Sequence, residues 1–554
     1  MQLPLPSVLW PAPGSPAMLS AADAELPVIA VCGSDGEIHS ALETGRWCLE
    51  AQRSGRQTPL KVLRVGPLRR GQLPPQAQPL AELLPVDRSE LVEIWLHPLG
   101  PLRSPAPSPP ELQHLTYNGQ IVRTRAVAVC GPSRRLRLAF AADLHLAGFW
   151  DRLHADAQGT LPHLARRMLH PTRLWRQFVA EANEQWRQGN LDLVVLGGDL
   201  VEYVFDPARA EMGRPRTTNI DRLLQALEPL EAPTITLPGN HEHRAYGWRP
   251  RLYGLQAVGL SAAEGRELLR ATGRWGRGWL RPSDLDALRV YDEQSRPALL
   301  PYLQHISPGH DFVCNLGGLR MIFLSTGCDA LARWRTLDRN RLGSLAASPW
   351  NLWRLPDAEG LKDEQAAWLS GLLQDPQPTA VFSHAPILHP GDGPYDDQAL
   401  SFSHSPRDRA QLRLERRLRC AGFTAGGCLR NSGVVLHALA QAPGPVALFS
   451  AHVHRAGAVR LDRRRGCLHC LPLQALPANM LQPDRCDPLF LSAPAVGQLS
   501  PTGDGQPGYL FAEFQAGQLV DLQRVYLHEH QQSPQSDDSP HSTGRPSLAV
   551  SSVD

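Results

Sequence analysis

The sequence predicts an α/β fold preceded by a smaller, mostly β module. From about residue 131 onward, short apolar runs alternate with amphipathic helical patterns, as they do in βαβ units. Between residues 26 and 130 the short apolar runs are instead separated by proline and glycine, which is typical of strands and turns. Polar side chains that can bind a metal ion follow several of the later runs, so we expect the functional site in the α/β part.

Composition limits the class of protein. The chain has 554 residues, which is long enough for more than one domain. Its 56 lysines and arginines nearly balance its 54 aspartates and glutamates, and a net charge of +2 argues against a protein that coats nucleic acid. The ten cysteines are too scattered for a disulfide framework. The most apolar window, 432–451, is interrupted by polar residues and prolines, so we expect no membrane span and a cytoplasmic location.

The N-terminal part divides into two segments. Residues 1–25 are rich in proline and lack the features of a signal peptide, so we expect a flexible leader. Residues 26–130 are interpreted as a β sandwich that could bind a protein partner or a targeting factor, and no chemistry is visible in them. Their apolar runs are 28–31, 60–65, 91–95 and 121–129.

The α/β part is expected to span residues 131–530, followed by a disordered tail over 531–554 that has almost no large apolar residues. Five apolar runs are predicted to be buried strands: 136–142, 191–196, 234–237, 380–382 and 446–449. Amphipathic helices are predicted at 172–188, 220–230 and 361–373. The long segment 243–379 is interpreted as a lid insertion.

Each of the five predicted strands is followed by side chains that can bind a metal ion. Because the carboxyl ends of parallel strands meet at one edge of a sheet, we expect these side chains to converge. Carboxylate, imidazole and amide groups suit manganese, iron, zinc or similar ions. The side chains are Asp143 and His145, Asp199, Asn240 and His241, His384, and His452 and His454.

Single histidine motifs carry little weight in a chain with 21 histidines. The His528/His530 pair adjoins the predicted disordered tail and is interpreted as non-functional, while His243 and His389 are interpreted as surface loop residues. The Cys467/Cys470 pair has no partner pair, so we interpret it as structural thiols. The signal therefore lies in the conjunction of the five strand ends.

In this order, the D-x-H, G-D, G-N-H, lone His and H-x-H blocks resemble those of the calcineurin-like metallophosphoesterase family. The resemblance covers about residues 133–530. It departs from the family pattern at Ser450-Ala451-His452, where Gly commonly precedes the first histidine. It implies an αββα sandwich with a dinuclear metal centre.

The resemblance also implies roles for individual residues. Asp199 would bridge two divalent or mixed-valence metal ions, and a metal-bound hydroxide would attack phosphorus. Asp143, His145 and His454 would complete one metal site, and Asn240, His384 and His452 the other. His241 would protonate the leaving oxygen. We expect Glu202, three residues after Asp199, to orient His241 and raise its basicity.

The predicted function is metal-dependent hydrolysis of a phosphoester, as a phosphatase or a phosphodiesterase, with a small-molecule substrate. A nuclease is an alternative, which the near-neutral charge disfavours. A non-catalytic scaffold on the same fold is a second alternative, but no expected ligand is missing. The substrate, the metal pair, the oligomeric state and the role of residues 26–130 stay open.

Overall fold

The computed structural model describes most of the two β-rich parts and the helices between them. The described residues are 7–20, 25–31, 41–67, 91–100, 102, 112–130, 135–204, 218–242, 252–273, 296–309, 311–326, 361, 363–388, 432–463, 467–471, 487–499 and 506–527. The predicted tail, 531–554, lies outside them. None of the helices in these ranges is long and apolar enough to cross a membrane.

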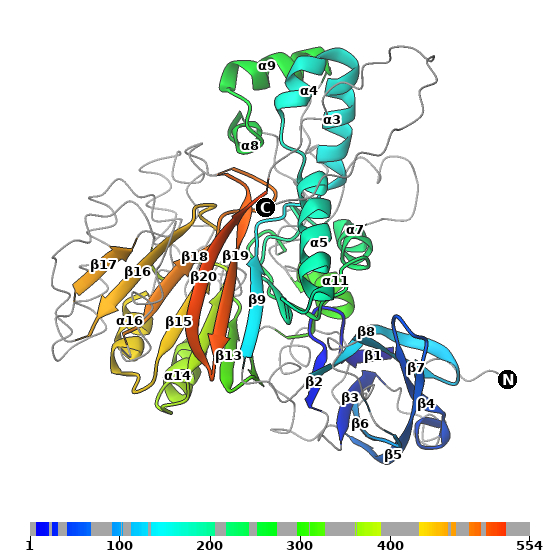
Figure 1. The fold of residues 1–554 in the computed structure, drawn as a ribbon. Coiled ribbons are helices and arrows are strands. Elements are labelled where there is room, and N and C mark those ends of the chain that lie inside the picture. The colour runs from blue at the N-terminus through cyan, green and yellow to red at the C-terminus, as the bar shows by residue number, and fades with distance from the viewer. Residues whose placement is uncertain are drawn as a thin grey trace, which may run out of the picture.

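The N-terminal part is a single eight-stranded sheet that curls round on itself (Figure 1). Its strand order is β1-β3-β6-β5-β4-β7-β8-β2, and β1 also lies against β8. The mostly β module is confirmed, although it is one curled sheet rather than a sandwich of two. The strands are β1 (Ser7–Trp10), β2 (Ala17–Ser20), β3 (Leu26–Val31), β4 (Trp47–Ala51), β5 (Gln57–Pro67), β6 (Leu91–Pro98), β7 (Leu112–Tyr117) and β8 (Gln120–Cys130).

The flexible leader expected over residues 1–25 is wrong for β1 and β2. Strand β1 pairs with β3 and β2 pairs with β8, and Val8, Leu9 and Trp10 are buried. The proline and glycine that suggested flexibility lie in the turn between these two strands. There the Gly14 N–H donates to the Ile306 carbonyl oxygen, and a Cβ at position 14 would lie 2.4 Å from Oγ1 of Thr236 in the α/β part. The turn is therefore tightly packed against the α/β part of the chain.

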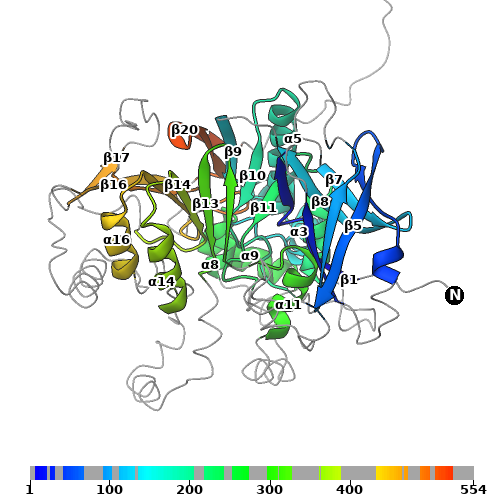
Figure 2. The same ribbon diagram turned by 90° about the horizontal axis from the view of Figure 1, so that it is seen from below.

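Two further sheets form the centre of the molecule and pack face to face (Figure 2). The first has the order β11-β10-β9-β19-β20 and the second β12-β13-β14-β15-β18-β16-β17. The first comprises β9 (Arg135–Ala141), β10 (Leu193–Leu196), β11 (Thr234–Thr236), β19 (Gly508–Gln515) and β20 (Gln518–Tyr526). The second comprises β12 (Phe312–Leu316), β13 (Leu319–Leu324), β14 (Thr379–Ser383), β15 (Val446–Ser450), β16 (Gly457–Asp462), β17 (Cys467–Leu471) and β18 (Leu489–Ser492).

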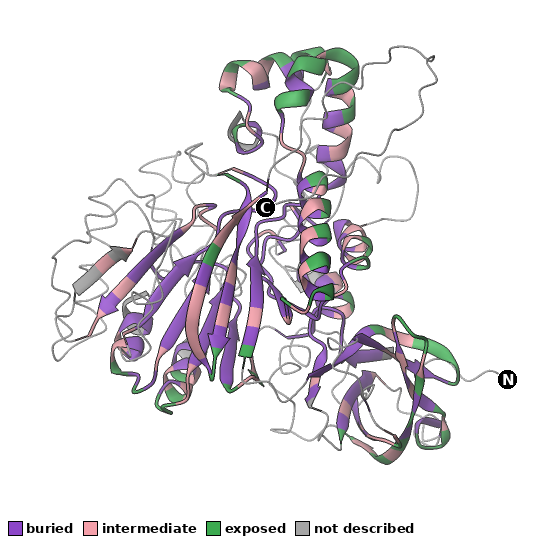
Figure 3. Ribbon diagram, in the orientation of Figure 1, coloured by how far each residue is buried: buried purple, intermediate pink, exposed green. Residues whose placement is uncertain are grey.

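Aromatic side chains join the two central sheets. Phe140 of β9 contacts Phe382 of β14 and Phe449 of β15, with ring centroids 5.8 and 5.6 Å apart. Phe323 of β13 stacks on Phe382 at 5.0 Å. These strands are buried on both faces, so they are continuous apolar runs rather than alternating ones. Figure 3 shows them buried along most of their length.

Helices cover the outer faces of both central sheets, which confirms the expected αββα arrangement. On the first sheet lie α5 (Pro171–Arg187), α7 (Asn219–Leu227) and α11 (Arg296–His305). On the second lie α14 (Asp363–Leu372) and α16 (Ser432–Gln441). Helix α5 buries Leu174, Phe178 and Trp186 along one stripe, as its amphipathic pattern predicts.

Four helices form an extension beyond the sandwich (Figure 1). They are α3 (Gly148–Thr160), α4 (Pro162–Arg167), α8 (Leu252–Ala257) and α9 (Ala262–Ala271). They share their own apolar cluster, which includes Phe149, Trp150 and Leu268.

The lid expected over residues 243–379 is wrong for part of that segment. Strand β13 is an inner strand of the second sheet, parallel to β14 and pairing Phe323 with Phe382. The sequence analysis did not predict this strand, because its apolar run is not followed by a candidate metal ligand as the five predicted strands are. Residues 274–295 and 327–360 of the segment lie outside the described residues.

Candidate metal centre

The ends of five strands deliver the candidate ligands to one place. Strands β9, β10 and β11 are parallel in the first sheet, and β14 and β15 are parallel in the second. The sandwich brings these carboxyl ends together, and all nine site residues named from the sequence lie at them. The residues are Asp143, His145, Asp199, Glu202, Asn240, His241, His384, His452 and His454.

Five candidate ligands adopt a backbone conformation that side chains rarely favour. The φ angles are +54° at Asp143, +49° at His145, +51° at Asp199, +69° at His452 and +55° at His454. A left-handed conformation is costly for residues other than glycine, and such residues gather at functional sites. The strain therefore marks these strand ends as a site.

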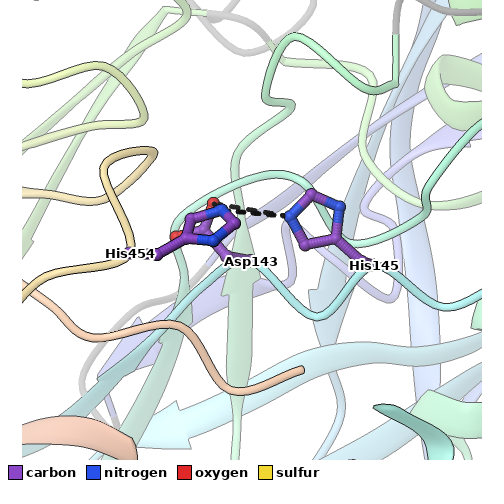
Figure 4. Close-up of side chains that lie close together, drawn as sticks. All are labelled: Asp143, His145 and His454. Carbon is purple, nitrogen blue, oxygen red and sulfur yellow. Dashed lines mark hydrogen bonds and ion pairs between the residues drawn. The ribbon is translucent and has the colours of Figure 1, made fainter. Parts of the chain in front are cut away.

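The first ligand group consists of Asp143, His145 and His454 (Figure 4). Nε2 of His145 lies 3.3 Å from Nε2 of His454. Oδ1 of Asp143 lies 3.4 Å from Nε2 of His454 and 3.9 Å from Nε2 of His145. The three ligand atoms thus surround one small space.

The second ligand group consists of Asp199, His384 and His452, joined by Asn240. Nε2 of His384 lies 3.2 Å from Oδ2 of Asp199, 3.1 Å from Oδ1 of Asn240 and 3.2 Å from Nδ1 of His452. Oδ2 of Asp199 also lies 3.9 Å from Nε2 of His145 in the first group. Asp199 therefore lies between the two groups.

The side chains in this cluster fit a cation site. Ring nitrogens face one another at hydrogen-bond distance in both groups, an arrangement that needs a proton or a cation between them. Oδ1 of Asp143 is buried and accepts no hydrogen bond from the described residues. An oxygen and nitrogen set without thiolates suits first-row divalent ions.

Opposite charges compete with burial in setting the pKa values of these groups. Burial by itself would lower the pKa of His384, but Asp199, together with Asp143 and the Gly197 carbonyl group, raises that pKa to about 9. Burial would raise the pKa of Asp199, yet His241 and His384 hold it well below its usual range. Likewise Glu202 raises the pKa of His145 against the effect of burial. The carboxylates thus attract positive charge into the cluster.

Polar contacts at Nδ1 orient the rings of three histidines. Nδ1 of His384 lies 2.8 Å from the Gly197 carbonyl oxygen, and Nδ1 of His145 lies 2.7 Å from the Glu202 carboxylate. Nδ1 of His454 lies 3.0 Å from a backbone carbonyl oxygen. Histidines that bind metals almost always donate their other ring N–H in this way. Each Nε2 is left facing the cluster.

Glu202 contacts His241, as the sequence predicts, but more closely with its main chain than with its carboxylate. Nδ1 of His241 lies 2.8 Å from the backbone carbonyl oxygen of Glu202 and 3.8 Å from its carboxylate. The carboxylate turns to His145 instead. Spacing along the chain placed Glu202 near His241, but it could not distinguish the main chain from the side chain.

Sequence reasoning missed the carboxylate of Glu242. This side chain is completely buried and accepts hydrogen bonds from four backbone N–H groups, those of Asp199, Leu200, Val201 and Gly239. Burial and the charge of Asp199 raise its pKa to about 7. Glu242 thus ties the loop after β10 to the loop after β11. Its position directly after Gly-Asn-His was the only available signal.

Several residues weighed from the sequence cannot be placed. His243, His389, His528 and His530 lie outside the described residues, as do the side chains of Cys467 and Cys470.

Comparisons with known proteins give one matching family model and several solved structures of low sequence identity. A family model described as "Calcineurin-like phosphoesterase" matches residues 136–456, more than half of the chain. No curated protein sequence matches. Among solved structures, a dimetal phosphatase from Danio rerio is 15% identical, with a TM-score of 0.33, covering 71% of this chain and 99% of its own. A structure of PhoD is 11% identical, with a TM-score of 0.36, covering 91% of this chain and 84% of its own.

Proposed function

This chain belongs to the calcineurin-like phosphoesterase family, and from that premise we propose that it is a metal-dependent hydrolase of small-molecule phosphoesters. The observation that carries the proposal is the convergence of Asp143, Asp199, His384 and His454 from four strand ends. Chain segments more than 300 positions apart in the sequence contribute to this one buried cluster. All the ligands that the family pattern calls for are present, which favours an enzyme over a scaffold.

We assign the ligands by the two groups described above; His241, which also lies near His145 and Asp199, is assigned another role below. Asp143, His145 and His454 would hold one ion, and Asn240, His384 and His452 the other. Asp199 lies between the groups and would contact both ions. Divalent ions bound there supply a nucleophile, by lowering the pKa of water, and neutralise charge on the phosphate oxygens.

We assign to His241 the protonation of the leaving oxygen. Its Nδ1–H donates to the Glu202 carbonyl oxygen, so the ring orientation is fixed by the main chain. Its Nε2 points toward the cluster, 3.7 Å from Oδ2 of Asp199. The side chain is 12% exposed, more than the adjacent His145 and Asp199 at 2% each, and this exposure gives a substrate access to the ring. A histidine with this access can act as a general acid near neutral pH.

Turnover of two model substrates tests the proposal. The full-length protein is treated with a chelator, resupplied with Mn²⁺ and assayed with p-nitrophenyl phosphate and bis(p-nitrophenyl) phosphate, which also separates a phosphatase from a diesterase. We expect the chelator to abolish turnover and Mn²⁺ to restore it. Asp199→Asn should lower kcat/KM at least about 100-fold, since even residues behind metal ligands cost 10–100-fold.

The matched control is Asp521→Asn, the same change on β20, where the Asp521 carboxylate accepts a hydrogen bond from Gln523. Turnover that survives the chelator, or that is equal in Asp199→Asn and Asp521→Asn, would overturn the proposed function.

A further inference from the structure

The loop that follows β18 contacts the first ligand group, although it lies beyond residue 456, where the family match ends. Residues Val496–Leu499, here named the strap, run alongside the loop after β9. The Val496 N–H donates to the Ala142 carbonyl oxygen at 3.0 Å, at the point where the chain leaves β9. This hydrogen bond anchors the strap at the edge of the first ligand group.

Gly497 brings the strap against the first ligand of that group. Its N–H donates to the Asp143 carbonyl oxygen at 3.0 Å. A Cβ at position 497 would lie 2.0 Å from the Leu144 carbonyl oxygen. Only glycine therefore permits this approach, and the close contact fixes the main chain that carries the Asp143 carboxylate.

Gln498 acts on His145, another ligand of the first group, through the Glu202 carboxylate. Its side-chain amide is buried, at 6% exposure, and Nε2 donates to Oε2 of Glu202 at 3.0 Å. The same oxygen lies 2.7 Å from Nδ1 of His145. Gln498 thus restrains the carboxylate that orients the His145 ring.

Leu499 contacts His454, the remaining ligand of the first group, with its main chain. Its carbonyl oxygen lies 3.0 Å from Nδ1 of His454. Its N–H donates to the Ala257 carbonyl oxygen at 2.7 Å, at the end of α8. Three consecutive residues therefore contact the first ligand group: Gly497 and Leu499 directly, and Gln498 through Glu202. The strap also links this ligand group to the helical extension.

We propose that the strap is a positioning element for the metal site formed by Asp143, His145 and His454, with Gln498 acting through Glu202. The proposal rests on the proposed function, because it assumes that these residues bind a metal. The second ligand group has a different anchor, the Gly197 carbonyl oxygen that accepts from His384. Changes in the strap should therefore affect one metal site and spare the other.

Calorimetric titration of metal-free, full-length protein with Mn²⁺ tests this selectivity without using activity. We expect two binding events in the wild type. Gln498→Leu keeps the size of the side chain but removes the donor, and should weaken one event about 10–100-fold and leave the other unchanged. Gln498→Asn, which keeps the amide but is one methylene too short to reach Glu202, should act in the same way.

Two further variants make the test specific. Gln523→Leu, the matched change on β20, should bind Mn²⁺ like the wild type. Because Gln498 is proposed to act through Glu202, Glu202→Gln and the double variant with Gln498→Leu should show the same loss, a non-additive result. Unfolding midpoints in chelator separate loss of metal binding from loss of fold.

The outcomes distinguish the two proposals. No Mn²⁺ binding in the wild type would overturn the proposed function, and the strap proposal with it. Two wild-type events that Gln498→Leu and Gln498→Asn leave unchanged would overturn the strap proposal alone. Equal weakening of both events, or additive losses in the double variant, would also overturn the strap proposal while leaving the proposed function intact.

Discussion

Nδ1 of His241 lies 2.8 Å from the main-chain carbonyl oxygen of Glu202, while the side chain of Glu202 lies 2.7 Å from Nδ1 of His145. One residue therefore orients two histidines with two different groups. A substitution that changes only the carboxylate leaves the acceptor of His241 in place. The proposed ligand and the proposed general acid can thus be tested independently.

Glu202→Gln and His241→Asn should affect different properties, Mn²⁺ binding and kcat. Glu202→Gln should weaken Mn²⁺ binding about 10–100-fold, because the carboxylate orients His145. His241→Asn should spare Mn²⁺ binding but lower kcat about 10²–10⁴-fold for alkyl phosphates, whose leaving oxygen needs a proton. Its effect on p-nitrophenyl phosphate, which has a better leaving group, should be smaller. A loss in His241→Asn that is the same for both substrates would contradict the general-acid role.

Arg125 should be a main source of stability at the junction between the N-terminal sheet and the sandwich. Its guanidinium group, 4% exposed, donates from β8 to the carbonyl oxygens of Leu227, Leu230 and Ala232, between α7 and β11. Burial lowers its pKa to about 10, so the group stays charged at neutral pH. Arg125→Met would leave buried carbonyl groups without donors.

We expect Arg125→Met to lower the free energy of unfolding by about 3 kcal/mol or more, as measured with urea. The control is Arg135→Met, since Arg135 is largely exposed and pairs with Glu513 at the surface. That change should cost less than about 1 kcal/mol. Equal stability of the two variants would show that the junction does not depend on Arg125.

His170 should make the protein less stable in acid. Burial, the neighbouring His154, and the charges of Arg173 and Arg176 lower its pKa to about 4, while Asp151 opposes them. Between pH 4 and 6.5 the unfolded chain binds a proton at this position and the folded chain does not. The free energy of unfolding therefore rises with pH across this window, by at most about 3 kcal/mol.

Urea unfolding at several pH values between 4.5 and 7.5 measures this effect. His170→Gln should reduce the rise in the free energy of unfolding, because the substituted side chain does not titrate. His163→Gln, on an exposed position of α4, serves as the control and should keep the wild-type slope. Equal slopes in all three proteins would contradict the assignment to His170.

The fold could be predicted where an apolar run is followed by a residue that can bind a metal ion. The runs before Asp143, Asp199, Asn240, His384 and His452 are strands β9, β10, β11, β14 and β15. Strands β1 and β2 could not be predicted, because prolines and glycine surround them and tertiary pairing decides their conformation. Closure of the N-terminal sheet likewise depends on long-range pairing that no local pattern carries.

The sequence was sufficient to predict which residues form the site, but not which atoms of those residues contact one another. Strand ends bring the ligands together, and this follows from the geometry of parallel sheets. The contacts of Glu202, Glu242 and Gln498 depend on side-chain direction and on loops that meet only in the folded chain. Gln498 is separated from Glu202 by 296 positions, so spacing gave no indication of their contact.

The central claim is that one cluster holds two neighbouring metal ions, with Asp199 between them. Electron paramagnetic resonance of the full-length protein loaded with Mn²⁺ tests it most directly, because two-metal sites hold their ions about 3.5–4 Å apart and such ions couple magnetically. We predict a spin-coupled Mn²⁺ pair at two equivalents per chain, and loss of the coupling in Asp199→Asn. A spectrum of isolated Mn²⁺ ions at every loading of the wild type would contradict the claim.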